Sequence, residues 1–232
     1  MANIHFIGGE KGGVGKSMTS RLLAQYHIDH NLPFTGFDSD QSHGTFSRFY
    51  ADFAAPVKVT EEDSLDSIIT CLEETPDAHI IIDLAAQTAS WLSAWVTELD
   101  VFSLLHDMGH QVYFWHVMDD GADSSQLLAR SLAKYPQPEL KFVVVMNFGR
   151  GKDFSLFKTT DAYQQAQQRQ AVLFELSRLQ ARLTQKIDFA DLSFWAAANN
   201  KELMSTTERQ RVKVWLNNNY QQFDTILSAP AD

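Results

Sequence analysis

Residues 11–17 read Lys-Gly-Gly-Val-Gly-Lys-Ser and stand between two segments of different character. The apolar run at residues 4–8 is typical of a buried strand, and residues 16–30 are typical of a helix. The stretch matches the end of the phosphate-loop pattern G-x-x-x-x-G-K-[ST], except that Glu10 occupies the position of the first glycine. A strand, a glycine-rich turn and a helix in this order predict a phosphate-binding loop.

The residue types in this loop suit a bound triphosphate. Glycines let backbone N–H groups approach phosphate oxygens closely, and the helix N-terminus adds free N–H donors. Lys16 is expected to reach the β- and γ-phosphates, and the Ser17 hydroxyl to bind Mg²⁺. The expected nucleotide-binding residues of the loop are Gly12, Gly13, Val14, Gly15, Lys16, Ser17 and Met18.

The rest of the chain alternates short apolar runs with longer helical patterns. Strands are expected at residues 34–38, 57–60, 79–83, 111–118 and 141–147, and helices at 63–74, 88–108 and 123–135. This alternation predicts an α/β fold of three layers, a mostly parallel sheet with helices on both faces. We expect one domain over residues 1–232, in which residues 150–232 form a helical portion packed on the rest, with helices at 160–186 and from a capping box at 205–208 to about 227.

Composition limits the class of protein. The chain has 232 residues, 44% of them hydrophobic, and one cysteine, so a disulfide framework within one chain is excluded. Neither a leader peptide nor an apolar run of about 18 residues is evident, so we expect a cytoplasmic protein without a membrane span. Residues 1–129 carry a net charge of −14 and residues 130–232 one of +4, which leaves open a basic face for an anionic partner.

Lys-Gly-Gly-Val-Gly-Lys-Ser resembles the deviant phosphate loop of the ParA/MinD family of P-loop ATPases. The resemblance covers about residues 3–147 and implies the ATPase fold, ATP or ADP with Mg²⁺ as cofactors, and slow hydrolysis stimulated by an unidentified protein partner. In that family the early lysine, here Lys11, reaches the phosphates of the partner subunit. The resemblance therefore implies a catalytic role for Lys11 and an ATP-dependent homodimer.

Two further segments extend this resemblance to acidic residues. Asp38-Ser39-Asp40-Gln41 is similar to the family's first switch segment, although Gln41 stands where the family usually has proline. By resemblance, Asp40 would position the attacking water and Asp38 would support the magnesium shell. Residues 79–83 form an apolar run that ends in Asp83, which can bind Mg²⁺ through water. A turn cap remains the alternative for Asp38 and Asp40, and a strand-terminal aspartate without a metal role remains the alternative for Asp83.

Asn147 ends the run Val143-Val144-Val145-Met146-Asn147 and resembles the family's base-contacting asparagine. Its amide can both donate to and accept from the edge of adenine. The guanine-specific pattern N-K-x-D is absent, since Phe148, Gly149 and Arg150 follow. ATP is therefore favoured over GTP, while a simple turn residue stays the alternative for Asn147.

Three functions remain open on these grounds. The first is an ATP-driven dimerisation switch that positions or segregates plasmid DNA or a protein cargo. The second is an accessory ATPase of conjugative plasmid transfer, and the third is a metabolic ATPase of the cobyrinate-amidation type, which would need a substrate pocket. The cargo and the physiological process are not encoded in any motif.

Several other signals are weaker. His106 and His110 have helical ligand spacing but no evident third ligand. Asp119, Asp120 and Asp123 favour a loop cap. The basic residues leave non-specific DNA contact as an alternative to a solvated face, and membrane binding by the last helix is not expected. These basic residues are Arg178, Arg182, Lys186, Arg209, Arg211 and Lys213.

Overall fold

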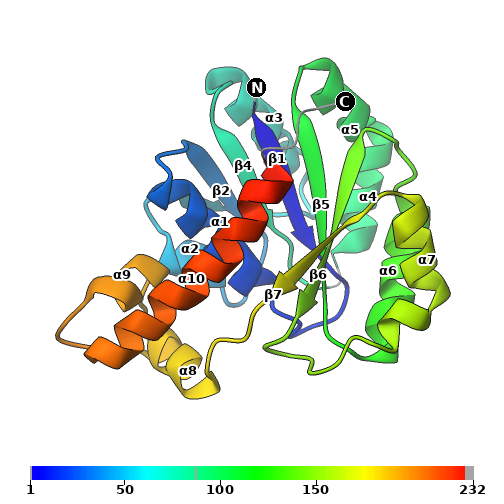
Figure 1. Ribbon diagram of the computed structural model, residues 1–232. Coiled ribbons are helices and arrows are strands. Elements are labelled where there is room, and N and C mark those ends of the chain that lie inside the picture. Colours follow the sequence, from blue (N-terminus) through cyan, green and yellow to red (C-terminus); the bar gives the residue numbers. More distant parts are fainter. Residues whose placement is uncertain (1, 87, 228–232) are drawn as a thin grey trace.

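Seven strands form one sheet in the order β3-β2-β4-β1-β5-β6-β7, and every adjacent pair is parallel. The computed structural model describes residues 2–86 and 88–227 (Figure 1). The predicted α/β fold is confirmed, and its sheet is parallel throughout the described residues. The strands are β1 (Asn3–Gly8), β2 (Phe34–Asp38), β3 (Ala54–Pro56), β4 (His79–Asp83), β5 (Gln111–Met118), β6 (Leu140–Asn147) and β7 (Val172–Leu176).

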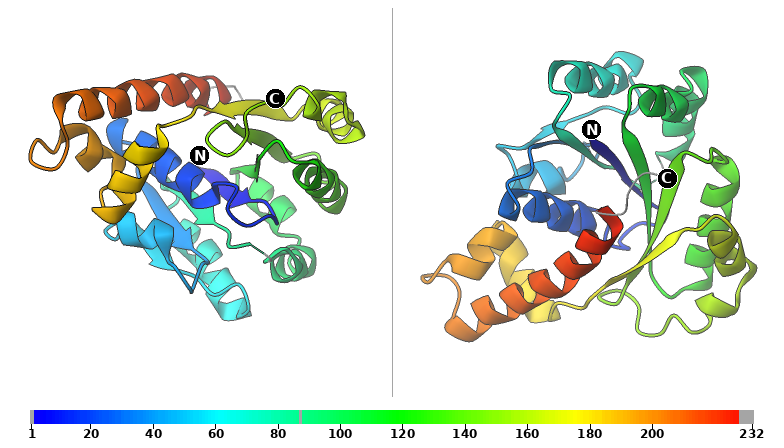
Figure 2. Two further views of the ribbon diagram at one scale, coloured as in Figure 1. Left: turned by 90° about the horizontal axis from the view of Figure 1, so that it is seen from below. Right: turned by 45° about the horizontal axis from the view of Figure 1, so that its top comes forward.

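Helices cover both faces of the sheet, each over its own apolar cluster. One face carries α3 (Glu62–Glu74), α4 (Ala89–Glu98), α5 (Val101–Asp107), α6 (Ala122–Lys134) and α7 (Asp161–Gln168). The other carries α1 (Lys16–Asp29), α2 (Thr45–Phe49), α8 (Ala181–Phe189), α9 (Phe194–Asn199) and α10 (Thr206–Leu227). A short 3-10 turn, η1 (Phe157–Thr159), precedes α7. Figure 2 shows α10 and α3 on opposite sides of the sheet.

The sheet brings the ends of distant strands to one edge. Asp38 at the end of β2 lies in register with Asp83 at the end of β4, and Gly8 at the end of β1 lies in register with His116 in β5. In an open parallel sheet, ligands bind outside the carboxyl ends of the strands. The loop after β1 and both aspartates therefore meet at the edge where a ligand site is expected.

Residues 160–186 do not form one helix, which corrects the prediction from the sequence. Helix α7 ends at Gln168, Gln170 takes a positive φ of 53°, and β7 then joins the sheet beside β6. Leucines at three- and four-residue steps suggested a helix, but Phe174 and Leu176 are buried at the two-residue step of a strand. The portion after residue 150 thus contributes a strand as well as helices.

Two other boundaries differ from the sequence prediction. The helix predicted at residues 88–108 is two helices, α4 and α5, because Asp100 between them adopts φ 45°. The edge strand predicted at residues 57–60 lies instead at Ala54–Pro56. The capping box is confirmed, since Glu208 accepts from the Ser205 N–H at 2.8 Å and Ser205 Oγ accepts from the Glu208 N–H at 3.3 Å. None of the helices in residues 2–86 and 88–227 is long and apolar enough to cross a membrane.

His5, His27 and His79 form a buried group whose candidate ligand atoms lie within 4.8 Å of one another. Their hydrogen bonds argue against a metal. His5 Nδ1 accepts from the Trp115 indole N–H at 3.1 Å, and His79 Nδ1 accepts from the Asn3 N–H at 3.0 Å. Each of these neutral rings must then carry its proton on Nε2, whereas a metal-binding histidine offers one bare nitrogen and donates from the other. Only His27, which contacts a carbonyl of its own helix, fits that pattern.

Candidate nucleotide-binding site

Gly15 sits at the turn from the phosphate loop into α1, with a left-handed φ of 108°. A Cβ at this position would collide with the side-chain nitrogen of Asn147. A side chain at Gly12 would meet nothing within 4 Å, and Gly12 has no left-handed φ. The two glycines therefore differ. The positive φ and the close contact with Asn147 both require a glycine at position 15, and neither constraint applies at position 12.

Gly15→Ala is expected to lower the free energy of unfolding by about 2–3 kcal/mol, because it adds both φ strain and a clash with Asn147. Gly12→Ala is the matched control and should stay within about 0.5 kcal/mol of wild type. Urea unfolding of the nucleotide-free proteins measures both. Equal stabilities for the two variants would show that the loop does not depend on the conformation at Gly15.

Lys16 begins α1 and is only 8% exposed. Its ammonium donates to the backbone oxygen of Lys11 at 3.1 Å. Burial lowers the pKa of Lys16, while the nearby carboxylate of Asp83 opposes this shift. A buried ammonium at the edge of the sheet is suited to bind phosphate oxygens. On binding, it would exchange the neutral Lys11 carbonyl for several charged oxygens.

Asp83 has a buried carboxylate that lacks hydrogen bonds of good geometry. Neither of its oxygens has a hydrogen bond of good geometry within the described part of the chain. Burial raises its pKa to about 7, although the hydroxyls of Ser17 and Ser20 lie close enough to favour the charged form. The nearby Lys16 ammonium only partly offsets the cost of burying this carboxylate, and a bound cation would lower that cost further.

These observations provide a test of whether Mg²⁺ fits the site. The ion prefers oxygen ligands and retains several waters, so it needs only one or two protein groups beside the phosphates. Asp83 and the Ser17 hydroxyl supply such oxygens at the end of β4 and the start of α1. The donor set therefore fits magnesium.

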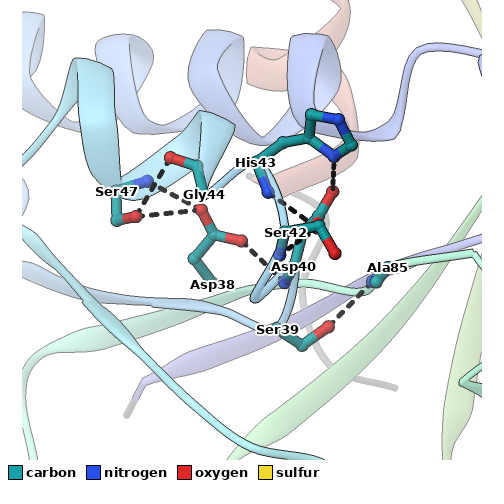
Figure 3. A network of polar contacts seen from close by, with 8 residues as sticks. All are labelled: Asp38, Ser39, Asp40, Ser42, His43, Gly44, Ser47 and Ala85. Carbon is teal, nitrogen blue, oxygen red and sulfur yellow. Dashed lines mark hydrogen bonds and ion pairs between the residues drawn. The ribbon is translucent and has the colours of Figure 1, made fainter.

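Asp38 and Asp40 organise the loop between β2 and α2 (Figure 3). Asp38 accepts from the Asp40 N–H at 3.0 Å through one oxygen, and from the Ser47 N–H and hydroxyl at 2.9 and 3.1 Å through the other. Asp40 accepts from the N–H groups of Ser42 and His43 at 2.9 and 3.1 Å. Both side chains thus make the turn-capping contacts that were the alternative reading. The predicted roles of Asp40 with water and Asp38 with metal remain proposals.

Ser39 connects this loop to the segment after β4. Its hydroxyl accepts from the Ala85 N–H at 2.8 Å, and its own N–H donates to the Asp83 carbonyl at 3.0 Å (Figure 3). A movement of the loop that carries Asp40 would therefore also displace the residues that follow Asp83. The resemblance to the family implied that Asp40 and Asp83 lie near the nucleotide, but it did not indicate this link.

The Asn147 side chain contacts the backbone of the phosphate loop. Its Nδ2 donates to the Val14 carbonyl at 2.7 Å, and its Oδ1 accepts from the Gly149 N–H at 2.8 Å. The side chain is 4% exposed. Because both ends of the amide are engaged within the protein, a base contact by Asn147 requires rearrangement, and that role stays a proposal.

Most of the predicted residues line one cavity of about 780 Å³, whereas Lys11, Val14 and Asp38 are not among its lining residues. The sequence did not indicate its far wall, which comes from the loops after β6 and β7 and from α8. Such residues carry no motif, and only the chain path brings them to the site. The lining includes Gly12, Gly13, Gly15, Lys16, Ser17, Met18, Asp40, His43, Asp83, Asn147, Arg150, Lys152, Ser177, Arg178 and Asp188.

Two of the residues that suggested a basic face are engaged locally. Lys186 pairs with Glu208 at 2.8 Å, and Arg209 donates to the backbone oxygen of Met204. Arg178 lines the cavity rather than extending a separate surface. The carboxylate of Glu208 offsets the charge of Lys186, while Arg209 and Arg178 keep theirs, and DNA contact remains a proposal.

Curated proteins related in sequence cover from two thirds to nearly all of the chain. Protein TraL of Escherichia coli is 28% identical over 243 residues, with 97% of this chain and 98% of the relative covered. Protein MobD of Acidithiobacillus ferrooxidans is 26% identical over 157 residues, with 67% and 68% covered. No protein-family model matches the sequence.

Solved structures share the fold at much lower identity. The MinD cell division protein of Aquifex aeolicus superposes with a TM-score of 0.58 at 10% identity, with 100% of this chain and 99% of that chain covered. A nucleotide-binding protein from Archaeoglobus fulgidus, in complex with ADP, has a TM-score of 0.51 at 14% identity, with 84% and 88% covered. At these identities the likeness concerns the arrangement of strands and helices.

Proposed function

We propose that this chain, which has the fold of the ParA/MinD-like P-loop NTPases, is a Mg²⁺-dependent ATPase that works as a dimerisation switch. ATP would favour the dimer, and hydrolysis would remove that preference. The observation that carries the proposal is the buried carboxylate of Asp83, which lacks regular partners beside a glycine loop with two lysines.

Each site residue has a physical role in this proposal. The loop N–H groups and the Lys16 ammonium bind the phosphates, while Ser17 and Asp83 hold the cation. Magnesium, when bound, supplies positive charge to the phosphate oxygens. Asp40 orients the attacking water from the loop after β2, and Ser39 couples that loop to the segment after β4.

Plasmid transfer is favoured over plasmid segregation as the process served. The names of the relatives, TraL and MobD, fit an accessory ATPase of transfer. A transfer ATPase would use the same switch to act on other proteins, and an unidentified protein would stimulate hydrolysis. A metabolic ATPase of the cobyrinate-amidation type has no comparable support among these relatives.

Asp40→Ala is expected to retain ATP binding and lose about 100-fold or more in turnover, because water is positioned mainly in the transition state. The trapped variant should dimerise with ATP and Mg²⁺. Adding Lys11→Ala should abolish that dimer, since the lysine would contact the partner's phosphates, whereas Lys11→Arg keeps a charge and should retain part of it. Light scattering and phosphate release measure the two effects.

Two results would contradict the switch. Full turnover in Asp40→Ala would show that another group positions the water. A Lys11→Ala protein that dimerises as well as its parent would favour a monomeric P-loop enzyme. Wild type with ADP is the control, and it should remain monomeric at the same concentration.

A further inference from the structure

Lys11 is held within its own subunit by Asp119. Its ammonium lies 3.0 Å from one oxygen of Asp119 and 2.9 Å from the other. The two side chains are 32% and 21% exposed, so the pair is partly shielded from water. Lys11, which is expected to reach another subunit, therefore has a charged partner within its own subunit, 108 positions away in the sequence.

Hydrogen bonds other than the one from Lys11 hold the Asp119 side chain in position. Its Oδ1 also accepts from the Ser124 hydroxyl at 2.6 Å and from the Gly121 N–H at 3.1 Å, at the start of α6. Partial burial works against ionisation, but the hydrogen bonds from Ser124, Lys11 and Gly121 outweigh it and hold the pKa of Asp119 below its ordinary value. The carboxylate is thus charged and oriented at neutral pH, which lowers the entropic cost of binding Lys11.

The backbone of Lys11 has a second restraint. Its carbonyl oxygen accepts from the Lys16 ammonium at 3.1 Å. Phosphates bound in the same subunit would take that ammonium away and leave Asp119 as the restraint on Lys11. Nucleotide in one subunit therefore loosens Lys11, and nucleotide in the other subunit competes for it with more negative charge than one carboxylate carries.

We propose that Asp119 is a positioning residue that retains Lys11 in the nucleotide-free monomer and so sets the ATP concentration at which two subunits combine. The inference rests on the proposed dimerisation switch. Dimer formation requires the Lys11–Asp119 pair to open and the ammonium to move to phosphate oxygens of the partner. A weaker pair would shift the equilibrium toward the dimer, because less interaction is lost on association.

Asp119→Asn separates this role from simple capping. Asparagine keeps an oxygen that accepts from Gly121 and Ser124 but removes the charge that binds Lys11. Asp120→Asn is the matched control. The Asp120 carboxylate accepts from the N–H groups of Lys152 and Asp153 at 2.7 and 3.2 Å, and among the described residues it forms neither a hydrogen bond nor an ion pair with Lys11.

The first measurement uses the full-length protein without nucleotide. An amine-reactive reagent and peptide mass spectrometry report the modification rate of Lys11. Asp119→Asn should raise that rate about threefold or more, because an amine released from the ion pair is more accessible to the reagent. Asp120→Asn should leave it unchanged. Equal rates in wild type and Asp119→Asn would overturn the proposal.

The second measurement is the dimer dissociation constant with ATP and Mg²⁺, in an Asp40→Ala background that prevents turnover. Asp119→Asn should tighten the dimer about three- to fivefold, the scale of a partly exposed ion pair. Weaker or unchanged dimerisation would overturn the proposal. If Asp119→Asn does not fold, Ser124→Ala, which loosens Asp119 while keeping its charge, should shift both readouts in the same direction by less.

The two hypotheses fail separately. A parent protein that stays monomeric with ATP removes the dimerisation switch, while the modification rate still reports whether Asp119 retains Lys11. A parent that dimerises while Asp119→Asn matches it in both measurements removes only the role of Asp119.

Discussion

Lys16→Ala is expected to weaken ATP binding by roughly 30- to 1,000-fold, the range for removing one member of a buried, hydrogen-bonded charge pair. The loop N–H groups would remain, but no other ammonium stands at the start of α1. Lys16 is 8% exposed and its ammonium contacts only the Lys11 carbonyl through a hydrogen bond among the described residues. Its charge is thus available to the phosphates at little structural cost.

Equilibrium binding of a fluorescent ATP analogue measures this effect, with thermal unfolding to confirm the fold. Lys58→Ala is a suitable control, because Lys58 lies on the surface and pairs with Glu61 at 2.9 Å, far along the chain from the loop. Unchanged affinity in a folded Lys16→Ala protein would refute the assignment of the phosphate loop.

Asp83→Asn is expected to stabilise the metal-free protein while it removes Mg²⁺-dependent activity. Burial raises the folded-state pKa of Asp83 to about 7 from its ordinary value of 3.8. A group with a raised folded pKa costs nothing at low pH and lowers stability as pH rises through that pKa. At pH 8 the neutral amide should therefore raise the free energy of unfolding by at most about 4 kcal/mol.

The measurement is the difference in unfolding free energy between Asp83→Asn and wild type across pH, without metal. That difference should grow between about pH 4 and pH 7 and then level off. Adding Mg²⁺ with nucleotide should stabilise wild type more than the variant, and turnover should fall about 100-fold. A variant that is less stable than wild type at pH 8 without metal would show that the carboxylate has strong partners in the fold.

Asn147 illustrates where sequence reasoning stopped. Its position after the apolar run at residues 142–146 placed it correctly at the end of β6, because a short apolar run bounded by turn residues encodes a buried strand. Its hydrogen bonds to Val14 and Gly149 could not be read in the same way. A side chain's partner depends on which strand ends lie next to it, and a neighbour in the sheet can be more than a hundred residues away.

The C-terminal portion shows a second kind of limit. Apolar residues at 172, 173, 176, 179 and 183 satisfy helical spacing, yet the first of these belong to β7. A short apolar segment is ambiguous between strand and helix, and pairing with the open edge of β6 decides the outcome. The break between α4 and α5 was also missed, because no glycine or proline marks it. Asp100 takes a left-handed φ there.

The sequence by itself determined the phosphate loop, the alternation of strands and helices, and the arrival of Asp38, Asp83 and Asn147 at strand ends. These features are local, because periodicity and glycine-rich turns act over a few residues. The tertiary structure alone decided that Lys11 pairs with Asp119, that the Asp83 carboxylate lacks hydrogen bonds of good geometry among the described residues, and that Ser39 connects the loop after β2 to the segment after β4. Such contacts depend on the order of strands in the sheet, which places side chains from distant parts of the chain within hydrogen-bonding distance.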